Sequence, residues 1–173
     1  MKNKKWSFRA PVEYETNSLG WNSFVIVPNA ISDDVRKTVK DRRIIATFND
    51  VIVQHCAMMP KGNDTYFIFV SKELHKKLDI LKGEEVDIAI KPDTSKYGVP
   101  MDEEMKVVFQ EEPLAFNFFE RLTPGKQRAL IHIVKKVKNP DLRIKKSLTI
   151  AEHLIRNKGK LDFKELNEDF RRS

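Results

Sequence analysis

The stretch IIATFNDVIV, residues 44–53, shows most directly which kind of fold this chain adopts. An apolar run rich in β-branched residues stands on each side of Asn49-Asp50, a dipeptide that favours tight turns. Two such runs on either side of a short turn signal are typical of a β-hairpin. We therefore predict two antiparallel strands here, one over residues 44–48 and one over residues 51–53.

Other stretches of the first hundred residues also have the character of strands. Residues 6–10 alternate apolar and polar side chains, and the further candidates are residues 24–27, 66–70 and 86–90. Two short helices should lie between them, one capped by Ser32 and one running from Ser71 to about Leu78. Residues 60–64 form a turn cluster. Short strands spaced this closely predict a small β-barrel rather than a parallel sheet.

Apolar residues in the second half of the chain recur at the spacing of helices. The stripes are Ala115, Phe118, Phe119 and Leu122; Leu130, Ile133, Val134 and Val137; and Ile144, Leu148, Ala151 and Ile155. Each stripe predicts one amphipathic helix with an apolar side.

Local signals place the ends of these helices. Thr123-Pro124 and Asn139-Pro140 each combine a capping residue with a proline suited to the first helical position. Gly159 is a stop signal. Residues 162–165 resemble a capping box that opens a final short helix.

The chain should therefore have an α+β fold, mainly β-barrel plus helices. Residues 92–100, which hold Pro92, Gly98 and Pro100, are the natural boundary, so we assign 1–98 to a β-barrel domain and 99–173 to a helical segment. The stripe of Phe118, Phe119 and Leu122 needs an apolar partner, and we expect the helices to pack on the barrel.

The formal net charge of +7 is distributed unevenly along the chain. Residues 124–160 contain eleven Lys or Arg against two acidic residues, whereas residues 101–123 contain two against six. A basic segment of this kind attracts polyanions. The plainer interpretation is that long Lys and Arg side chains cover the helices while their charged heads stay in water.

Composition also indicates where the protein acts. No apolar run approaches the ~20 residues that a membrane-spanning helix needs, so we expect a soluble protein without membrane insertion. The single Cys56 cannot form an internal disulfide, which favours the cytoplasm.

The sequence contains few groups with catalytic chemistry, and we predict no catalytic residue, metal site or cofactor. The six glycines are scattered and form no phosphate loop. Neighbouring residues of a strand point to opposite faces, so His55 should be at the surface and Cys56 in the core. The acidic run 102–104 is typical of a helix start. His132 and His153 fall on the basic helices, where we expect both to be exposed.

The order of several segments resembles that of a bacterial barrel family of uncharacterised function. The blocks are residues 21–28, 41–50, 66–74 and 82–88. Residues 122–128 and 133–136 then resemble the start of a helical segment described as YdeI/OmpD-associated, or bacteriocin-protection. Lys135 and Arg143-Ile144 fit the usual helical pattern, whereas Lys138-Asn139-Pro140 replaces its central triplet.

This resemblance implies a fold more than a function. The family's barrel is similar to the double-split β-pseudobarrel of AbrB-type transcription regulators, which bind DNA as intertwined dimers. A shared fold is only an analogy for function.

Three functions stay open at this point. The first is a non-catalytic binding or interaction module that contacts a protein or polyanion partner through residues 124–160. The expected contact residues are Lys126, Arg128, Lys135, Lys136, Arg143, Lys145 and Lys146. The second is nucleic-acid binding by the same residues with an AbrB-like barrel. The third is a small-ligand binder or enzyme that uses a cleft between barrel and helices. We expect Arg128, His132 and Lys135 to form one ridge, and Arg143 and Lys146 a second.

Overall fold

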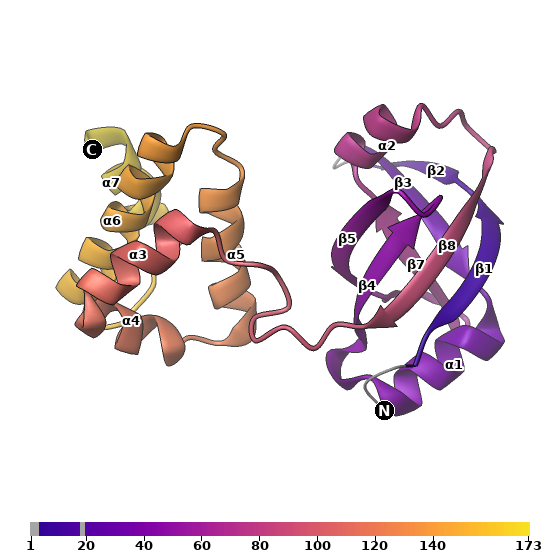
Figure 1. Ribbon diagram of the computed structural model, residues 1–173, viewed down its shortest axis with the longest axis horizontal. Coiled ribbons are helices and arrows are strands. Elements are labelled where there is room, and N and C mark those ends of the chain that lie inside the picture. The colour runs from indigo at the N-terminus through magenta and orange to yellow at the C-terminus, as the bar shows by residue number, and fades with distance from the viewer. Residues whose placement is uncertain (1–3, 18–19) are drawn as a thin grey trace. The chain divides into compact units, whose positions relative to one another are not determined.

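A computed structural model describes residues 4–17 and 20–173. The chain divides into two compact units, Met1–Thr94 and Ser95–Ser173, which we call the β-unit and the helical unit (Figure 1). The boundary predicted from the sequence lies between residues 98 and 99. Among the described residues all strands belong to the first unit, and the second unit is helical, so the predicted α+β class is confirmed.

The β-unit consists of two antiparallel four-stranded sheets with the orders β1-β8-β4-β5 and β2-β3-β7-β6. Its strands are β1 (Trp6–Pro11), β2 (Glu13–Asn17), β3 (Gly20–Val27), β4 (Arg43–Phe48), β5 (Ile52–Ala57), β6 (Met59–Gly62), β7 (Thr65–Val70) and β8 (Glu85–Pro92). Helix α1 (Asn29–Thr38), a 3-10 turn (Lys40–Arg42) and helix α2 (Lys72–Leu78) connect them. Closure of these sheets into a double-split pseudobarrel stays a prediction.

The predicted hairpin of residues 44–53 forms between β4 and β5. Asn49 and Asp50 both have positive φ, 47° and 54°, as a type I′ turn requires. Asn63 and Asp64 repeat this conformation between β6 and β7, with φ of 47° and 55°. The sequence predicts a turn over residues 60–64, whereas Met59–Gly62 is a short exposed strand.

The two sheets enclose one apolar core. Along β4 the side chains of Ile44, Ala46 and Phe48 are fully buried, because alternate residues of a strand point to the same face. Ile68 of β7 and Ile88 of β8 complete the centre of the same cluster.

One predicted helix start in the β-unit was wrong. Helix α1 begins at Asn29, directly after Pro28, and Ser32 lies inside its first turn. The Ser32 hydroxyl is fully buried and donates to the Asn29 carbonyl oxygen. The start after Ser71 is correct, because the Ser71 hydroxyl accepts a hydrogen bond from the Leu74 amide.

The helical unit contains α3 (Glu103–Glu111), α4 (Pro113–Glu120), α5 (Pro124–Lys135), α6 (Pro140–Arg156) and α7 (Phe163–Arg172). The predicted starts at Pro124 and Pro140 are confirmed, and the Asn139 side chain caps α6 by accepting from the amides of Asp141 and Leu142. Asp162 caps α7 in the same way. None of the described helices is long and apolar enough to cross a bilayer.

The aromatic stripe of α4 packs within the helical unit itself. Phe119 is fully buried beside Phe109, and Phe118 and Leu122 pack against the same cluster. Leu130, Ile150 and Leu154 are also fully buried there. The stripe therefore has its apolar partner inside this unit, and packing of the helices on the barrel stays a prediction.

Gly159 ends α6 as predicted and also allows close packing. Its φ is +83°, and a Cβ at this position would lie 2.7 Å from Cδ1 of Phe118. Both the backbone conformation and the space therefore favour glycine.

The predicted apolar face of α6 is correct in its second half, where Ala151 is buried and Ile155 packs against the core, and wrong in its first half. Ile144 and Leu148 are each 41% exposed, while Ser147, Ile150 and Leu154 face the core. Ser147 can be buried because its hydroxyl donates to the Arg143 carbonyl oxygen one turn earlier.

Candidate functional site

The predicted basic ridge on α5 is formed. Gln127, Leu130, Ile131 and Val134 are the buried residues of this helix. Arg128, His132 and Lys135 follow one another at spacings of four and three residues along a flank next to this buried face, where His132 and Lys135 are exposed and Arg128 is partly exposed.

The second predicted ridge is not formed, because its two residues bind within the helical unit. Arg143 donates through Nε to the Val137 carbonyl oxygen at 2.6 Å, and its Nη1 lies 3.5 Å from Oε1 of Glu104 on α3. Lys146 places its Nζ 4.1 Å from the ring centroid of Phe170 on α7. The two side chains therefore contact different neighbouring helices.

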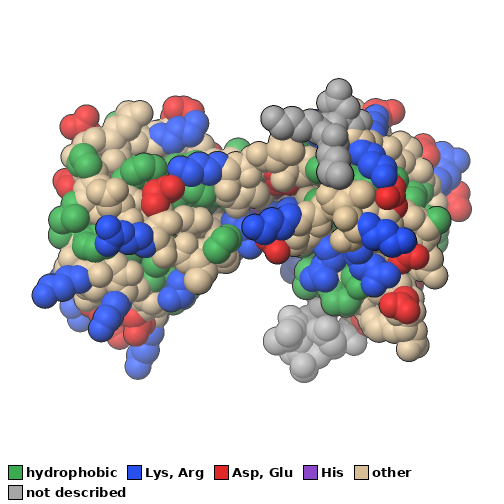
Figure 2. All heavy atoms as spheres, turned by 90° about the horizontal axis from the view of Figure 1, so that it is seen from below, with side chains coloured by type: hydrophobic (Ala, Val, Ile, Leu, Met, Phe, Trp, Pro, Cys, Tyr) green, Lys and Arg blue, Asp and Glu red, His purple; other side chains and the backbone are tan. Residues whose placement is uncertain are grey.

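The other predicted contact residues keep their charges available. Within the part of the chain that the structure describes, none of them forms an ion pair; they are Lys126, Arg128, Lys135, Lys136 and Lys145. On the face drawn in Figure 2, the Lys and Arg side chains of the helical unit are spread out with hydrophobic side chains between them. The acidic run 102–104 begins α3, as expected.

A polar cluster that no sequence pattern indicated joins α6 and α7, and the prediction that His153 is exposed was wrong. His153 is fully buried, and its Nδ1 lies 2.9 Å from Oδ2 of Asp169. Arg156 donates to Asp169 at 2.6 Å and to Glu165 at 2.9 Å. Asn157 donates to Glu165 at 3.2 Å. We call these five residues the α6–α7 clasp.

Both ring nitrogens of His153 have polar partners in the clasp. Nδ1 faces the carboxylate of Asp169 and also lies 3.4 Å from Nη2 of Arg156 and from Nδ2 of Asn157. Nε2 faces two donors, the Asp162 amide at 3.4 Å and Nδ2 of Asn157 at 3.3 Å. A buried imidazole with satisfied nitrogens stabilises the contact between the two helices.

Three clasp residues have the composition of a metal site. Ligand atoms of His153, Glu165 and Asp169 lie within 4.8 Å of one another. However, the guanidinium of Arg156 bonds to both carboxylates, and Nδ1 of His153 uses its proton for Asp169 instead of offering a lone pair. The donor set therefore fits an ion-paired cluster better than a divalent cation.

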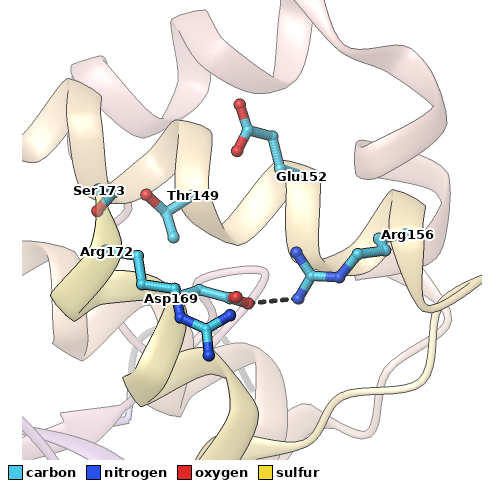
Figure 3. Close-up of a pocket in the computed structure, with 6 residues that line it drawn as sticks. All are labelled: Thr149, Glu152, Arg156, Asp169, Arg172 and Ser173. Carbon is cyan, nitrogen blue, oxygen red and sulfur yellow. Dashed lines mark hydrogen bonds and ion pairs between the residues drawn. The ribbon is translucent and has the colours of Figure 1, made fainter.

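A shallow cavity of about 210 Å³ adjoins the clasp (Figure 3). Thr149, Glu152 and Arg156 line it from α6, and Asp169, Arg172 and Ser173 line it from α7 and the residue that follows. The cavity shows that the end of α7 does not fill the adjacent side of α6.

The clasp should weaken in acid. Hydrogen bonds from Arg156 and then His153 lower the pKa of Asp169, and hydrogen bonds from Arg156 and then Asn157 lower the pKa of Glu165. A carboxyl whose folded pKa is lowered contributes stability above its unfolded pKa and loses it as the pH falls through the folded value. We expect the amides of α7 to lose hydrogen-exchange protection below about pH 4, near the unfolded pKa values. In Asp169→Asn this acid-dependent loss should be smaller, and an unchanged profile would contradict the assignment.

A second histidine lies in a hydrogen-bonded chain in the β-unit. Nε2 of His75 lies 2.6 Å from Oγ of Ser23, and its Nδ1 lies 3.4 Å from the hydroxyl of Tyr14. Ser23 is buried and donates its proton to the Val70 carbonyl oxygen at 2.9 Å. Its hydroxyl therefore accepts from His75, whereas a nucleophilic serine would donate to the histidine.

Cys56 and His55 point to opposite faces of β5, as predicted. Cys56 packs against the core of the β-unit, and burial raises the pKa of its thiol to about 11. The His55 side chain is only 22% exposed, because its Nδ1 pairs at 3.0 Å with the buried carboxylate of Asp93. The thiol is thus protonated at neutral pH, which disfavours a nucleophilic role.

Both units contain a segment that matches a known family. Residues 8–90 match a domain of unknown function (DUF1905), and residues 99–157 match the family described as bacteriocin-protection, YdeI or OmpD-associated. A search among curated proteins finds no match. The resemblance identified from the order of the sequence blocks is confirmed. The chain therefore contains, in this order, a segment that matches the domain of unknown function DUF1905 and a segment that matches the family described as bacteriocin-protection, YdeI or OmpD-associated.

Proposed function

We propose that this chain is a non-catalytic binding module whose helical unit contacts an anionic partner. The observation that carries the proposal is the set of cations on α5 and the start of α6 without ion pairs among the described residues. They are Lys126, Arg128, Lys135, Lys136 and Lys145. Unpaired surface cations that repeat along one helix add their potentials and attract negative charge.

The histidine clusters support binding rather than catalysis. His153 and His75 are held by hydrogen bonds within the fold, and the thiol of Cys56 is protonated. Hydrogen bonds of this kind fix helices and strands in place. The description OmpD-associated names association with another protein for members of the matched family. This wording also supports a binding role.

The double variant Lys135→Glu/Lys136→Glu tests the proposal. We expect it to bind heparin about ten-fold more weakly than the unaltered protein at low salt, because two attractive charges become repulsive. The dependence of the logarithm of affinity on the logarithm of salt concentration should become shallower by about two. Heparin chromatography and fluorescence titration at several salt concentrations would measure both quantities.

The matched control is Lys82→Glu/Lys164→Glu, which makes the same charge change at exposed positions outside residues 124–160. It should bind heparin almost as well as the unaltered protein. If both variants lose the same affinity, net charge rather than this surface attracts the polyanion. If the unaltered protein binds neither heparin nor random duplex DNA at low salt, the basic residues only solvate the helices.

A further inference from the structure

Helix α7 lies outside the domain that the family comparison recognises. The match ends at residue 157, at the end of α6, whereas α7 spans Phe163–Arg172. The side of α6 that α7 covers is therefore a surface of the recognised domain. The side chains with which α7 packs on this surface show which chemical groups the surface can bind.

The covered side of α6 is basic and polar. Lys146 contributes an ammonium group, Arg156 a guanidinium, and His153 and Asn157 contribute N–H donors. In contrast to the lysines of α5, these groups are all used by α7.

Helix α7 meets this surface as an acidic amphipathic helix. Glu165 and Asp169, four residues apart, bind the cationic and polar groups of the clasp. Leu166 is buried to 1% exposure, and Phe170 lies against Lys146. The pattern combines two carboxylates and two apolar anchors on one side of a short helix.

Few residues of α7 are buried. Leu166 is its only fully buried residue within the described part of the chain, and Phe163 is 38% exposed. A helix of ten residues is marginal in isolation, so its docking depends on Leu166, Phe170 and the hydrogen bonds of the clasp. An open cavity of about 210 Å³ lies between the last turn of α7 and α6, lined by Arg172 and Ser173 on one side and by Thr149 and Glu152 on the other (Figure 3). Elements with few buried contacts open at low free energy.

We infer that the α7-covered side of α6 is a docking surface for an acidic amphipathic helix of a partner protein, and that α7 is its displaceable resident occupant. The inference is separate from the proposed function, which uses the uncovered cations of α5. In helix-in-groove recognition, apolar residues at positions such as i and i+4 of the bound helix pack into the groove. Leu166 and Phe170 hold these positions in α7. The covalent link holds α7 at a high effective concentration, so a competing helix binds well only when α7 is loosened.

The experiment uses the full chain and a fluorescent peptide with the sequence of residues 161–173. In the unaltered protein the peptide should bind weakly because α7 occupies the surface. In Glu165→Gln/Asp169→Asn, which removes the clasp carboxylates of the resident helix, the peptide should bind about ten-fold more tightly, as competition falls. Hydrogen exchange should show that α7 has lost protection in this variant while α6 keeps it.

The matched control is Glu111→Gln/Glu168→Gln, which removes two carboxylates outside the clasp and should leave peptide binding unchanged. Adding Arg156→Ala to the loosened variant should abolish the gain, and a peptide of the same composition in scrambled order should not bind. The inference is overturned if α7 stays protected in the loosened variant, or if α7 is released and the peptide binds no better. It is also overturned if random duplex DNA gains affinity instead of the peptide, or if the variant forms dimers by exchanging α7.

Discussion

Phe119→Ala should destabilise the helical unit by about 3–5 kcal/mol, the cost of removing a fully buried aromatic ring. Phe119 has no exposed surface, and its ring centroid lies 4.8 Å from that of Phe109 and 5.4 Å from that of Tyr97. Truncation removes these contacts and leaves a cavity that the surrounding helices close only in part. Chemical denaturation, followed by residue-resolved hydrogen exchange, would measure the loss.

The matched variant is Phe48→Ala, because Phe48 is equally buried in the core of the β-unit. Each unit has its own core, so each variant should destabilise mainly the unit to which it belongs. Leu114→Ala is a control in the helical unit, since Leu114 is 52% exposed and should cost at most about 0.5 kcal/mol. Equal loss of protection in β4 and α6 after Phe119→Ala would show that the units unfold as one.

His153→Ala should destabilise the helical unit by about 2–4 kcal/mol. The side chain is fully buried, and its removal leaves the Asp162 amide without the acceptor Nε2 and creates a cavity between α6 and α7. Asp169 also loses the donor Nδ1 and keeps the bond from Arg156. Thermal unfolding at neutral pH would measure the change.

Two comparisons make this result specific to the clasp. His132→Ala changes a histidine on the exposed side of α5 and should cost far less. His153→Asn keeps an N–H donor near the position of Nδ1 and should recover part of the stability. The clasp would have no structural importance if His153→Ala and His132→Ala were equally stable.

Signals that act over a few residues predicted local structure well. Asn49-Asp50 formed the expected turn because both residues tolerate positive φ. Ser71, Asn139 and Asp162 capped the expected helices, since a side-chain oxygen needs only the two or three amides that follow it. In α1 the same reasoning failed, because Pro28 and not Ser32 preceded the first turn.

Which side of a helix becomes buried was harder to predict. The apolar pattern of α6 favoured Ile144 and Leu148, yet the core side contains Ser147 and the buried His153. Several helices pack around α6, so polar groups with nearby partners can be buried there at little cost. His153 has partners 9 and 16 residues further on, Asp162 and Asp169, and no spacing within α6 indicates them.

The sequence by itself determined the α+β class, most helix ends, the strand hairpin and the two family matches. Turn and capping residues act on the few residues next to them, and the families are recognised from the order of sequence segments. It also located the cations from which the contact surface is proposed. Only the tertiary structure decided which of these cations are available. Arg143 and Lys146 are bound by Glu104 of α3 and Phe170 of α7, which come close only when the helices pack. A charge read from sequence is a property of one residue, whereas its availability depends on partners that folding brings within a few ångströms.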